Sequence, residues 1–317
     1  MAETRDLLDI RSLHRDQIEL LVHRAVDLKG AVDDGKKLPD LSGKTLGLLF
    51  FENSTRTRVS FERAAHYLNM QTSSFIEAAS SISKGETLKD TILTLQNERL
   101  DGLVIRHKSS GSAAFGAQHF EGPVVNAGDG CHEHPTQALG DAMTILERKG
   151  TLEGLKVAIV GDVLHSRVAR SNAWLLSKYG AEIRFVGPRN LIPINMSRFP
   201  GTVYNNLYEG IADADVLICL RLQRERMNEG LLSSLAAYAR LYQVDSFAVG
   251  LAAKDCIVMH PGPINRGVEI DDEVADGPHS VVTAQVENGV FVRMAALEWV
   301  FGAAPQQVRT ASKRGAK

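Results

Sequence analysis

Residues 54–58 carry the strongest sign of chemistry in the sequence. They read Ser-Thr-Arg-Thr-Arg and lie between a predicted buried strand and a predicted helix. Free backbone N–H groups at a helix start, together with hydroxyls and a guanidinium, suit a phosphate. The alternative is a helix cap in which Ser54 or Thr55 satisfies backbone N–H groups while the arginines face water, but two arginines and three hydroxyls in five residues favour phosphate. The segment therefore predicts an anion site, and it is not a Walker loop because the required glycines and lysine are missing.

Two further polar segments of the first half can supply functional groups. Residues 80–87, Ser-Ser-Ile-Ser-Lys-Gly-Glu-Thr, offer Lys84 on a hydroxyl-rich loop, although a plain surface loop explains them equally well. Residues 126–137 form a glycine-containing loop after a predicted strand, where catalytic groups of α/β proteins often lie. There Pro135 holds His134 at a helix start, and its imidazole can donate to an oxygen. A metal is disfavoured, because no second His or Cys cluster has a matching spacing.

The second half offers two arginines at corresponding places. Residues 157–162, Val-Ala-Ile-Val-Gly-Asp, look like the opening of a dinucleotide-binding unit, but the later glycines are absent and a nicotinamide cofactor is disfavoured. That turn presents Arg167, and the loop after the strand ending at Leu220 presents Arg221 and Gln223. Two guanidiniums at one sheet edge can clamp two carboxylates. A stiff loop at residues 260–267, His-Pro-Gly-Pro-Ile-Asn-Arg-Gly, follows the last predicted strand.

Alternating strand and helix patterns must position these groups, which predicts an α/β fold of two doubly wound domains with parallel sheets, joined by helices. We expect domains at residues 1–150 and 151–290, a last helix at about 291–305 following a turn at 287–289, and a disordered basic tail at 306–317. The last helix can pack on either domain. The expected strands are 45–51, 102–105, 123–126, 156–160, 182–186, 215–220 and 257–260. A polar turn at 52–55 precedes a helix that carries Val59, Ala64, Ala65 and Leu68, and the other expected helices are about 15–28, 87–98, 137–148, 167–179, 231–240 and 291–301.

Composition limits the class of partner. The 317 residues contain 36 basic and 38 acidic side chains, so the formal charge of -2 provides no field for gripping nucleic acid or an anionic membrane. No apolar run reaches the roughly 18 residues that a membrane span needs. Three widely spaced cysteines form neither a disulfide framework nor a zinc framework, and the first residues lack the profile of a signal peptide. We therefore expect a cytoplasmic protein.

Taken together, six motifs in order resemble the aspartate/ornithine carbamoyltransferase family from about residue 7 to residue 300. They are STRTR at 54–58, SSISKGETLKDT at 80–91, HPTQ at 134–137, GDVLHSRVARS at 161–171, LRLQRERM at 220–227 and HPGPINRGVEI at 260–270. Ornithine-specific members usually have HPCQ and HCLP where this chain has HPTQ and HPGP. The likeness is therefore greatest to the aspartate-specific branch.

The resemblance implies a role for each motif. Carbamoyl phosphate and L-aspartate would be the substrates, with no cofactor and no metal. In a homotrimer, a loop of the neighbouring subunit would complete each site. By this likeness the catalytic residues are Arg56, Thr57, Lys84, Arg106 and His134, and the substrate-binding residues are Ser54, Thr55, Ser80, Gln137, Arg167, Arg221, Gln223, Gly262 and Pro263. Of these, Ser80 and Lys84 would act on the neighbour's site, and the last helix would return to the first domain.

Elementary chemistry agrees with these roles. Attack of a neutral amine on the carbonyl builds negative charge on its oxygen and expels phosphate, and each fixed donor typically contributes about 3 kcal/mol. We hypothesise that the departing phosphate takes the proton and that the two domains close over the substrates. The alternatives are another amine acceptor, such as ornithine, and a non-catalytic scaffold that assembles with other pyrimidine-pathway enzymes. Whether regulatory chains or a dihydroorotase join the trimer stays open.

Overall fold

Two parallel sheets form the framework of the computed structural model, which describes residues 5–76, 86–223 and 234–303. The first sheet has the order β2-β1-β3-β4 and the second β7-β6-β5-β8-β9. Every strand pair is parallel, which confirms the predicted α/β class. The strands are β1 (Thr45–Phe50), β2 (Gln71–Ile76), β3 (Gly102–His107), β4 (Val124–Asp129), β5 (Lys156–Val160), β6 (Glu182–Val186), β7 (Thr202–Tyr204), β8 (Val216–Cys219) and β9 (Ile257–Met259).

The strands that were predicted from the sequence contain runs of buried apolar residues. β5 and β6 have the predicted bounds, and both are almost wholly buried. Two strands at outer edges of the sheets, β2 and β7, were not predicted. β2 reads Gln-Thr-Ser-Ser-Phe-Ile and β7 is a largely exposed Thr-Val-Tyr. Neither has the apolar run by which a buried strand is recognised.

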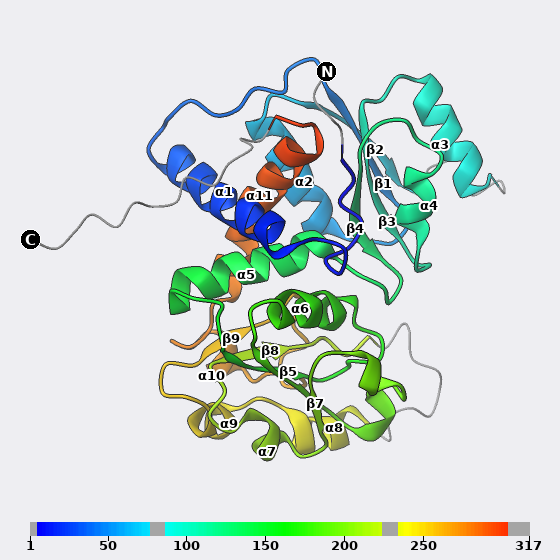
Figure 1. Cartoon of the computed structure of the whole chain (residues 1–317). Coiled ribbons are helices and arrows are strands. Elements are labelled where there is room, and N and C mark those ends of the chain that lie inside the picture. Colours follow the sequence, from blue (N-terminus) through cyan, green and yellow to red (C-terminus); the bar gives the residue numbers. More distant parts are fainter. Residues whose placement is uncertain (1–4, 77–85, 224–233, 304–317) are drawn as a thin grey trace, which may run out of the picture.

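Helices cover both sheets, and Figure 1 shows the two lobes stacked with α5 and α6 between them. Residues 80–85 of the predicted polar segment, residues 224–227 of the LRLQRERM motif and the predicted tail at 306–317 lie outside the described residues. No helix in the described part of the chain is long and apolar enough to cross a membrane. The α-helices are α1 (Arg15–Asp33), α2 (Thr55–Tyr67), α3 (Leu88–Asn97), α4 (Ser112–Ala117), α5 (Pro135–Lys149), α6 (Arg167–Ser177), α7 (Leu207–Ile211), α8 (Leu235–Tyr242), α9 (Ser246–Leu251), α10 (Asp272–Ala275) and α11 (Val282–Val300).

The predicted turn at residues 287–289 is wrong, and so is the predicted start of the last helix. α11 begins at Val282 and runs through the Glu-Asn-Gly sequence without a break. Asn288 is fully buried and donates from Nδ2 to Thr144 Oγ1 of α5 at 3.0 Å. A Cβ at Gly140 would lie 3.7 Å from the Cα of Gly289, so the two helices approach closely at these glycines. Packing therefore overrides the local turn preference.

α11 packs against helices of the first lobe. Arg24 of α1 forms two hydrogen bonds with Glu298, at 2.6 and 2.8 Å, and Nη1 of Arg293 donates to Ser60 Oγ of α2 at 3.0 Å. Figure 1 shows the orange to red helix running up from the second lobe between α1 and α2. One helix thus connects the end of the second sheet to α2.

Candidate active site

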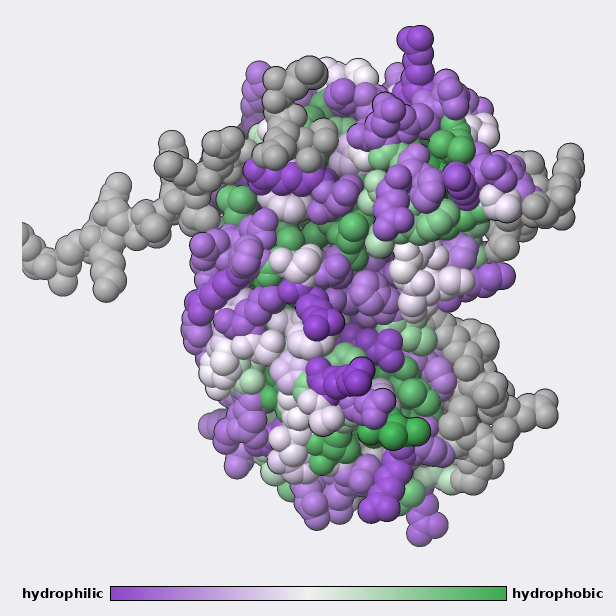
Figure 2. Space-filling view, turned by 45° about the vertical axis from the view of Figure 1, so that its right-hand side comes forward, coloured by the Kyte–Doolittle hydropathy of each residue, from purple (hydrophilic) through white to green (hydrophobic). Residues whose placement is uncertain are grey.

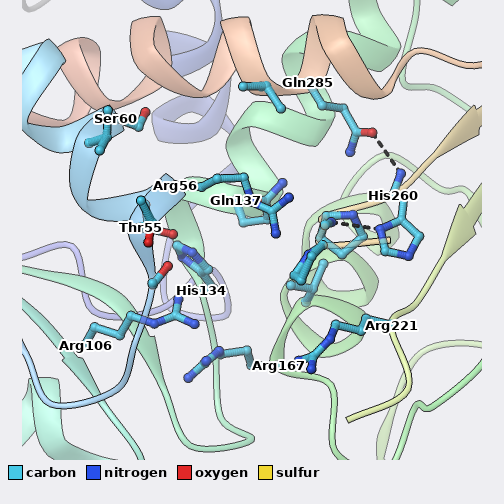
Figure 3. A pocket seen from close by; sticks show the side chains of 18 of the residues that line it. Thr55, Arg56, Ser60, Arg106, His134, Gln137, Arg167, Arg221, His260 and Gln285 are labelled. Atoms are coloured by element: carbon cyan, nitrogen blue, oxygen red, sulfur yellow. Dashed lines mark hydrogen bonds between the residues drawn. The ribbon is translucent and has the colours of Figure 1, made fainter. Parts of the chain in front are cut away.

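A cavity of about 940 Å³ lies between the two lobes. Its walls come from the turn after β1, the starts of α2, α5 and α6, the loops after β8 and β9, and α11. Figure 3 shows the labelled side chains facing one another from these separate elements. Among the lining residues that the structure describes, six are arginines, namely Arg56, Arg63, Arg106, Arg167, Arg221 and Arg293, and one, Glu52, is acidic. The cavity is therefore suited to anions.

The turn at residues 54–58 forms one wall. α2 begins at Thr55, and the side chain of its N-cap residue Ser54 makes no capping hydrogen bond. Ser54, Thr55, Arg56 and Thr57 line the cavity together. The backbone N–H groups in the first turn of a helix have no partner within the helix, which makes such a turn suited to an anion. Burial, and next the charge of Arg221, lower the pKa of Arg56. Arg58 is not among the lining residues, and its Nε lies 4.0 Å from Oε1 of Glu62.

His134 reaches the cavity as the N-cap residue of α5. Its side chain is buried, and Nδ1 has no hydrogen-bond partner among the described residues. Burial, then the charges of Arg106, Arg293 and Arg167, hold the pKa of the imidazole well below its ordinary value. A neutral ring carries one N–H donor and one acceptor. The imidazole can therefore donate to an oxygen without carrying a charge.

Glu52 joins arginines of both lobes and was not selected from the sequence. It follows β1 and pairs through Oε2 with Nη2 of Arg167, the first residue of α6. The same oxygen lies 3.4 Å from Nη2 of Arg106, whose Nη1 donates to the Ala127 carbonyl at 3.1 Å. The sequence does contain a signal for this residue, because Glu52 is an acidic side chain close to the anion motif at residues 54–58.

Arg221 and Gln223 line the cavity from the loop after β8. The backbone N–H of Gln223 donates to Oδ2 of Asp162 at 3.2 Å, which fixes this loop to the turn after β5. Arg167 starts α6 from that turn. The two guanidiniums thus lie at one edge of the second sheet, as predicted.

The loop after β9 closes the opposite wall. The Gly262-Pro263 bond is cis, and Gly262 has a φ of 65°. A Cβ at that position would collide with the guanidinium of Arg56, so only glycine allows this approach. The N–H of His260 donates to Gln285 Oε1 at 2.9 Å, and Nδ1 of His260 accepts from the Gly262 N–H at 2.8 Å (Figure 3). Burial lowers the pKa of His260 to about 3.

The structure brings most predicted site residues into this one cavity. Ser80 and Lys84 lie outside the described residues. Two lining residues of α11 were missed for different reasons. Gln285 precedes the predicted start of this helix, and Arg293 lies in a part for which only packing was expected. No group of three or more His, Cys, Asp or Glu side chains is placed to hold a metal within the described ranges. The predicted residues that line the cavity are Ser54, Thr55, Arg56, Thr57, Arg106, His134, Gln137, Arg167, Arg221, Gln223, Gly262 and Pro263.

Two family models match the chain. Residues 5–147 match the carbamoyl-P binding domain of aspartate/ornithine carbamoyltransferases, and residues 153–300 match the Asp/Orn binding domain. The chain is 48% identical to the aspartate carbamoyltransferase catalytic subunit of Pelotomaculum thermopropionicum, over 94% of this chain and 97% of that protein. It is 49% identical to that of Moorella thermoacetica, over 95% and 99% of the two chains.

Solved structures agree on the fold. Aspartate transcarbamoylase from Trypanosoma cruzi, in complex with carbamoyl aspartate and phosphate, has a TM-score of 0.85 at 32% identity, over 96% of this chain and 97% of that chain. Ornithine carbamoyltransferase from Pyrococcus furiosus has a TM-score of 0.86 at 30% identity, over 96% and 100%. The fold is common to both activities, while the sequence relatives above are aspartate enzymes. This chain therefore belongs to the aspartate/ornithine carbamoyltransferase family.

Proposed function

We propose that the protein transfers the carbamoyl group of carbamoyl phosphate to the amino group of L-aspartate, giving N-carbamoyl-L-aspartate and phosphate, a step of de novo pyrimidine biosynthesis. The observation that carries this proposal is the cavity between the lobes, which gathers arginines from both sheets. Both substrates are anions, so both need cationic donors. The curated relatives named above support the choice of aspartate.

Carbamoyl phosphate fits the wall formed by the first lobe. The first turn of α2 and Arg56 would hold its phosphate, while Thr57, Arg106 and His134 would face its carbonyl oxygen and Gln137 its amino group. Support comes from their common cavity and from the neutral state of His134, which makes it a donor to a developing oxyanion. We assign residues 1–150 to carbamoyl-phosphate binding on this basis.

Aspartate fits the wall formed by the second lobe. Arg167 and Arg221 lie at the same sheet edge and would clamp the two carboxylates, with Gln223 and the Gly262-Pro263 loop completing the acceptor site. An ornithine acceptor would instead call for an acidic side chain near its ammonium group. Glu52 is the acidic residue of the cavity wall, but it is paired with arginines. We assign residues 151–290 to aspartate binding.

The reaction would need no covalent nucleophile. The aspartate amine attacks the carbonyl carbon, the carbonyl oxygen gains charge against the donors described above, and the C–O bond to phosphate breaks. The departing phosphate then takes the proton released by the amine. Holding both anions in one cavity removes much of the entropic barrier.

We further propose a homotrimer with shared sites in the cytoplasm. The family resemblance supports the trimer, and the three free cysteines are compatible with a reducing compartment. Ser80 and Lys84 would reach the neighbour's cavity. Larger assemblies with regulatory chains or a dihydroorotase are compatible with such a trimer.

The acceptor assignment predicts that the purified protein carbamoylates aspartate and not ornithine when carbamoyl phosphate is held constant. Arg221→Ala should raise the KM for aspartate and lower kcat/KM by about 100-fold, because a charged hydrogen bond to a carboxylate is lost. Product formation with each amine is the measurement. Faster turnover with ornithine would overturn the acceptor, and no turnover with either would favour the scaffold alternative.

The neutral state of His134 predicts a pH dependence. Its folded-state pKa is depressed well below the ordinary 6.5, so the folded ring stays neutral as the pH falls through that value, whereas the ring of the unfolded chain takes up a proton there. We expect kcat from about pH 6 to about pH 9 to show no inflection that belongs to His134. His134→Asn should lower kcat by about 100-fold with a parallel profile. An acid limb near pH 6.5 that the variant lacks would contradict a neutral donor.

Shared sites predict complementation between two inactive variants. Lys84→Ala damages the loop given to the neighbour, and Arg106→Ala damages the subunit's own cavity. Each variant alone should be nearly inactive. Co-refolded in equal amounts, they should regain about a quarter of wild-type activity, since one site in four combines two intact parts. Absence of any recovery, with trimers formed, would exclude sites shared in this way.

A further inference from the structure

Asp141 is a buried carboxylate to which the reaction described above gives no role. It lies on α5, one helical turn beyond Gln137, and has no exposed surface. It is not among the residues that line the cavity. A carboxylate without access to water requires hydrogen-bond donors. Three amides provide them: Nε2 of Gln137 at 2.8 Å and Nε2 of Gln285 at 2.9 Å donate to Oδ1, and Nδ2 of Asn172 at 2.8 Å donates to Oδ2.

These bonds decide which way the amide of Gln137 faces. Burial raises the pKa of the Asp141 carboxyl, whereas the three amide donors lower it. Oδ1 accepts from Nε2 of both Gln137 and Gln285, so the NH₂ group of Gln137 is the end that turns toward Asp141. Its carbonyl oxygen is then the atom left for the cavity that Gln137 lines. An acceptor at this place matches an NH₂ group on the substrate. If the amide of Gln137 were reversed, its NH₂ group would face the NH₂ group of the substrate.

We propose that Asp141 is a positioning residue for carbamoyl transfer, which holds Nε2 of Gln137 so that the amide oxygen faces the amino group of carbamoyl phosphate. The inference rests on the proposed function, because the amino group belongs to that substrate. Asp141 touches no substrate itself. It acts through Gln137, and a glutamine without this partner can rotate about its last bond.

The same carboxylate connects this amide to the second lobe. Gln285 donates to Asp141 and accepts from the N–H of His260, at the start of the loop that lines the acceptor side. Asn172 lies on α6, the helix that begins with Arg167. Asp141 thus also joins α5, α6 and α11. Loss of its side chain will lower stability as well, so the test must separate the two effects.

A double-mutant cycle on the full chain makes that separation. Asp141→Ala and Gln137→Ala should each raise the KM for carbamoyl phosphate by about 10- to 100-fold, while the KM for aspartate changes much less. The double variant should be no worse than Gln137→Ala alone, because Asp141 works through that residue. Multiplying losses, or a wild-type KM for carbamoyl phosphate in Asp141→Ala, would overturn the proposal.

Asp141→Asn separates orientation from charge, and it remains informative if the alanine variant does not fold. The new carboxamide keeps one acceptor oxygen for Gln137 and Gln285. Its NH₂ group would face Asn172, whose buried Oδ1 has no hydrogen-bond partner among the described residues and can accept once that amide turns over. The KM for carbamoyl phosphate should therefore stay within about threefold of wild type. A rise above tenfold would overturn orientation as the role.

Asn288→Ala is the matched control. Asn288 lies one turn beyond Gln285 on α11 and makes the same kind of buried bond to α5, but outside the cavity. It should lower the melting temperature and leave the KM for carbamoyl phosphate unchanged. A similar KM rise in this variant would show that the effect of Asp141 is general loosening of the helices. Transfer by the wild-type protein, measured in the same series, tests the proposed function separately.

Discussion

The whole arrangement depends on cationic side chains held close together in a cavity whose described lining includes one acidic residue. Removing a charge from water is costly unless an opposite charge replaces the water. Glu52 compensates Arg167 and Arg106 in part, while burial and the nearby charge of Arg221 already lower the pKa of Arg56. The electrostatic cost of such a cluster is reduced most when two anionic substrates bind together.

The fold can carry this cluster because its parts are anchored elsewhere. The loops that follow the strands of each parallel sheet lie at the carboxyl edge of that sheet. α11 connects the end of the second sheet to α2 through the hydrogen bond from Arg293 to Ser60. Arg293 is buried, which lowers its pKa to about 10, yet it stays charged at neutral pH. Rigid placement of donors before the substrates arrive is what makes such donors effective.

The sequence predicted the parts of the molecule that local pattern determines. Buried strands such as β5 and β6 and the anion turn at residues 54–58 have signals within a few residues. The course of α11 through Asn288 was not predictable in this way, because a buried contact with Thr144 decides it. Glu52 and Asp141 were missed for the same reason. The arginine partners of Glu52 lie on other elements, and the partners of Asp141 are ordinary amides. Only the folded structure shows these contacts.

The most direct test of the charge cluster is the free energy of unfolding of the wild type and of Arg56→Ala, with and without N-(phosphonacetyl)-L-aspartate, the ligand of a solved relative. Without ligand the variant should be no less stable, because a partly buried cation near Arg221 is removed. The ligand at 100 times its Kd should stabilise the wild type by about 2.7 kcal/mol and the variant far less. A variant that is less stable when empty, yet equally stabilised by the ligand, would contradict the account.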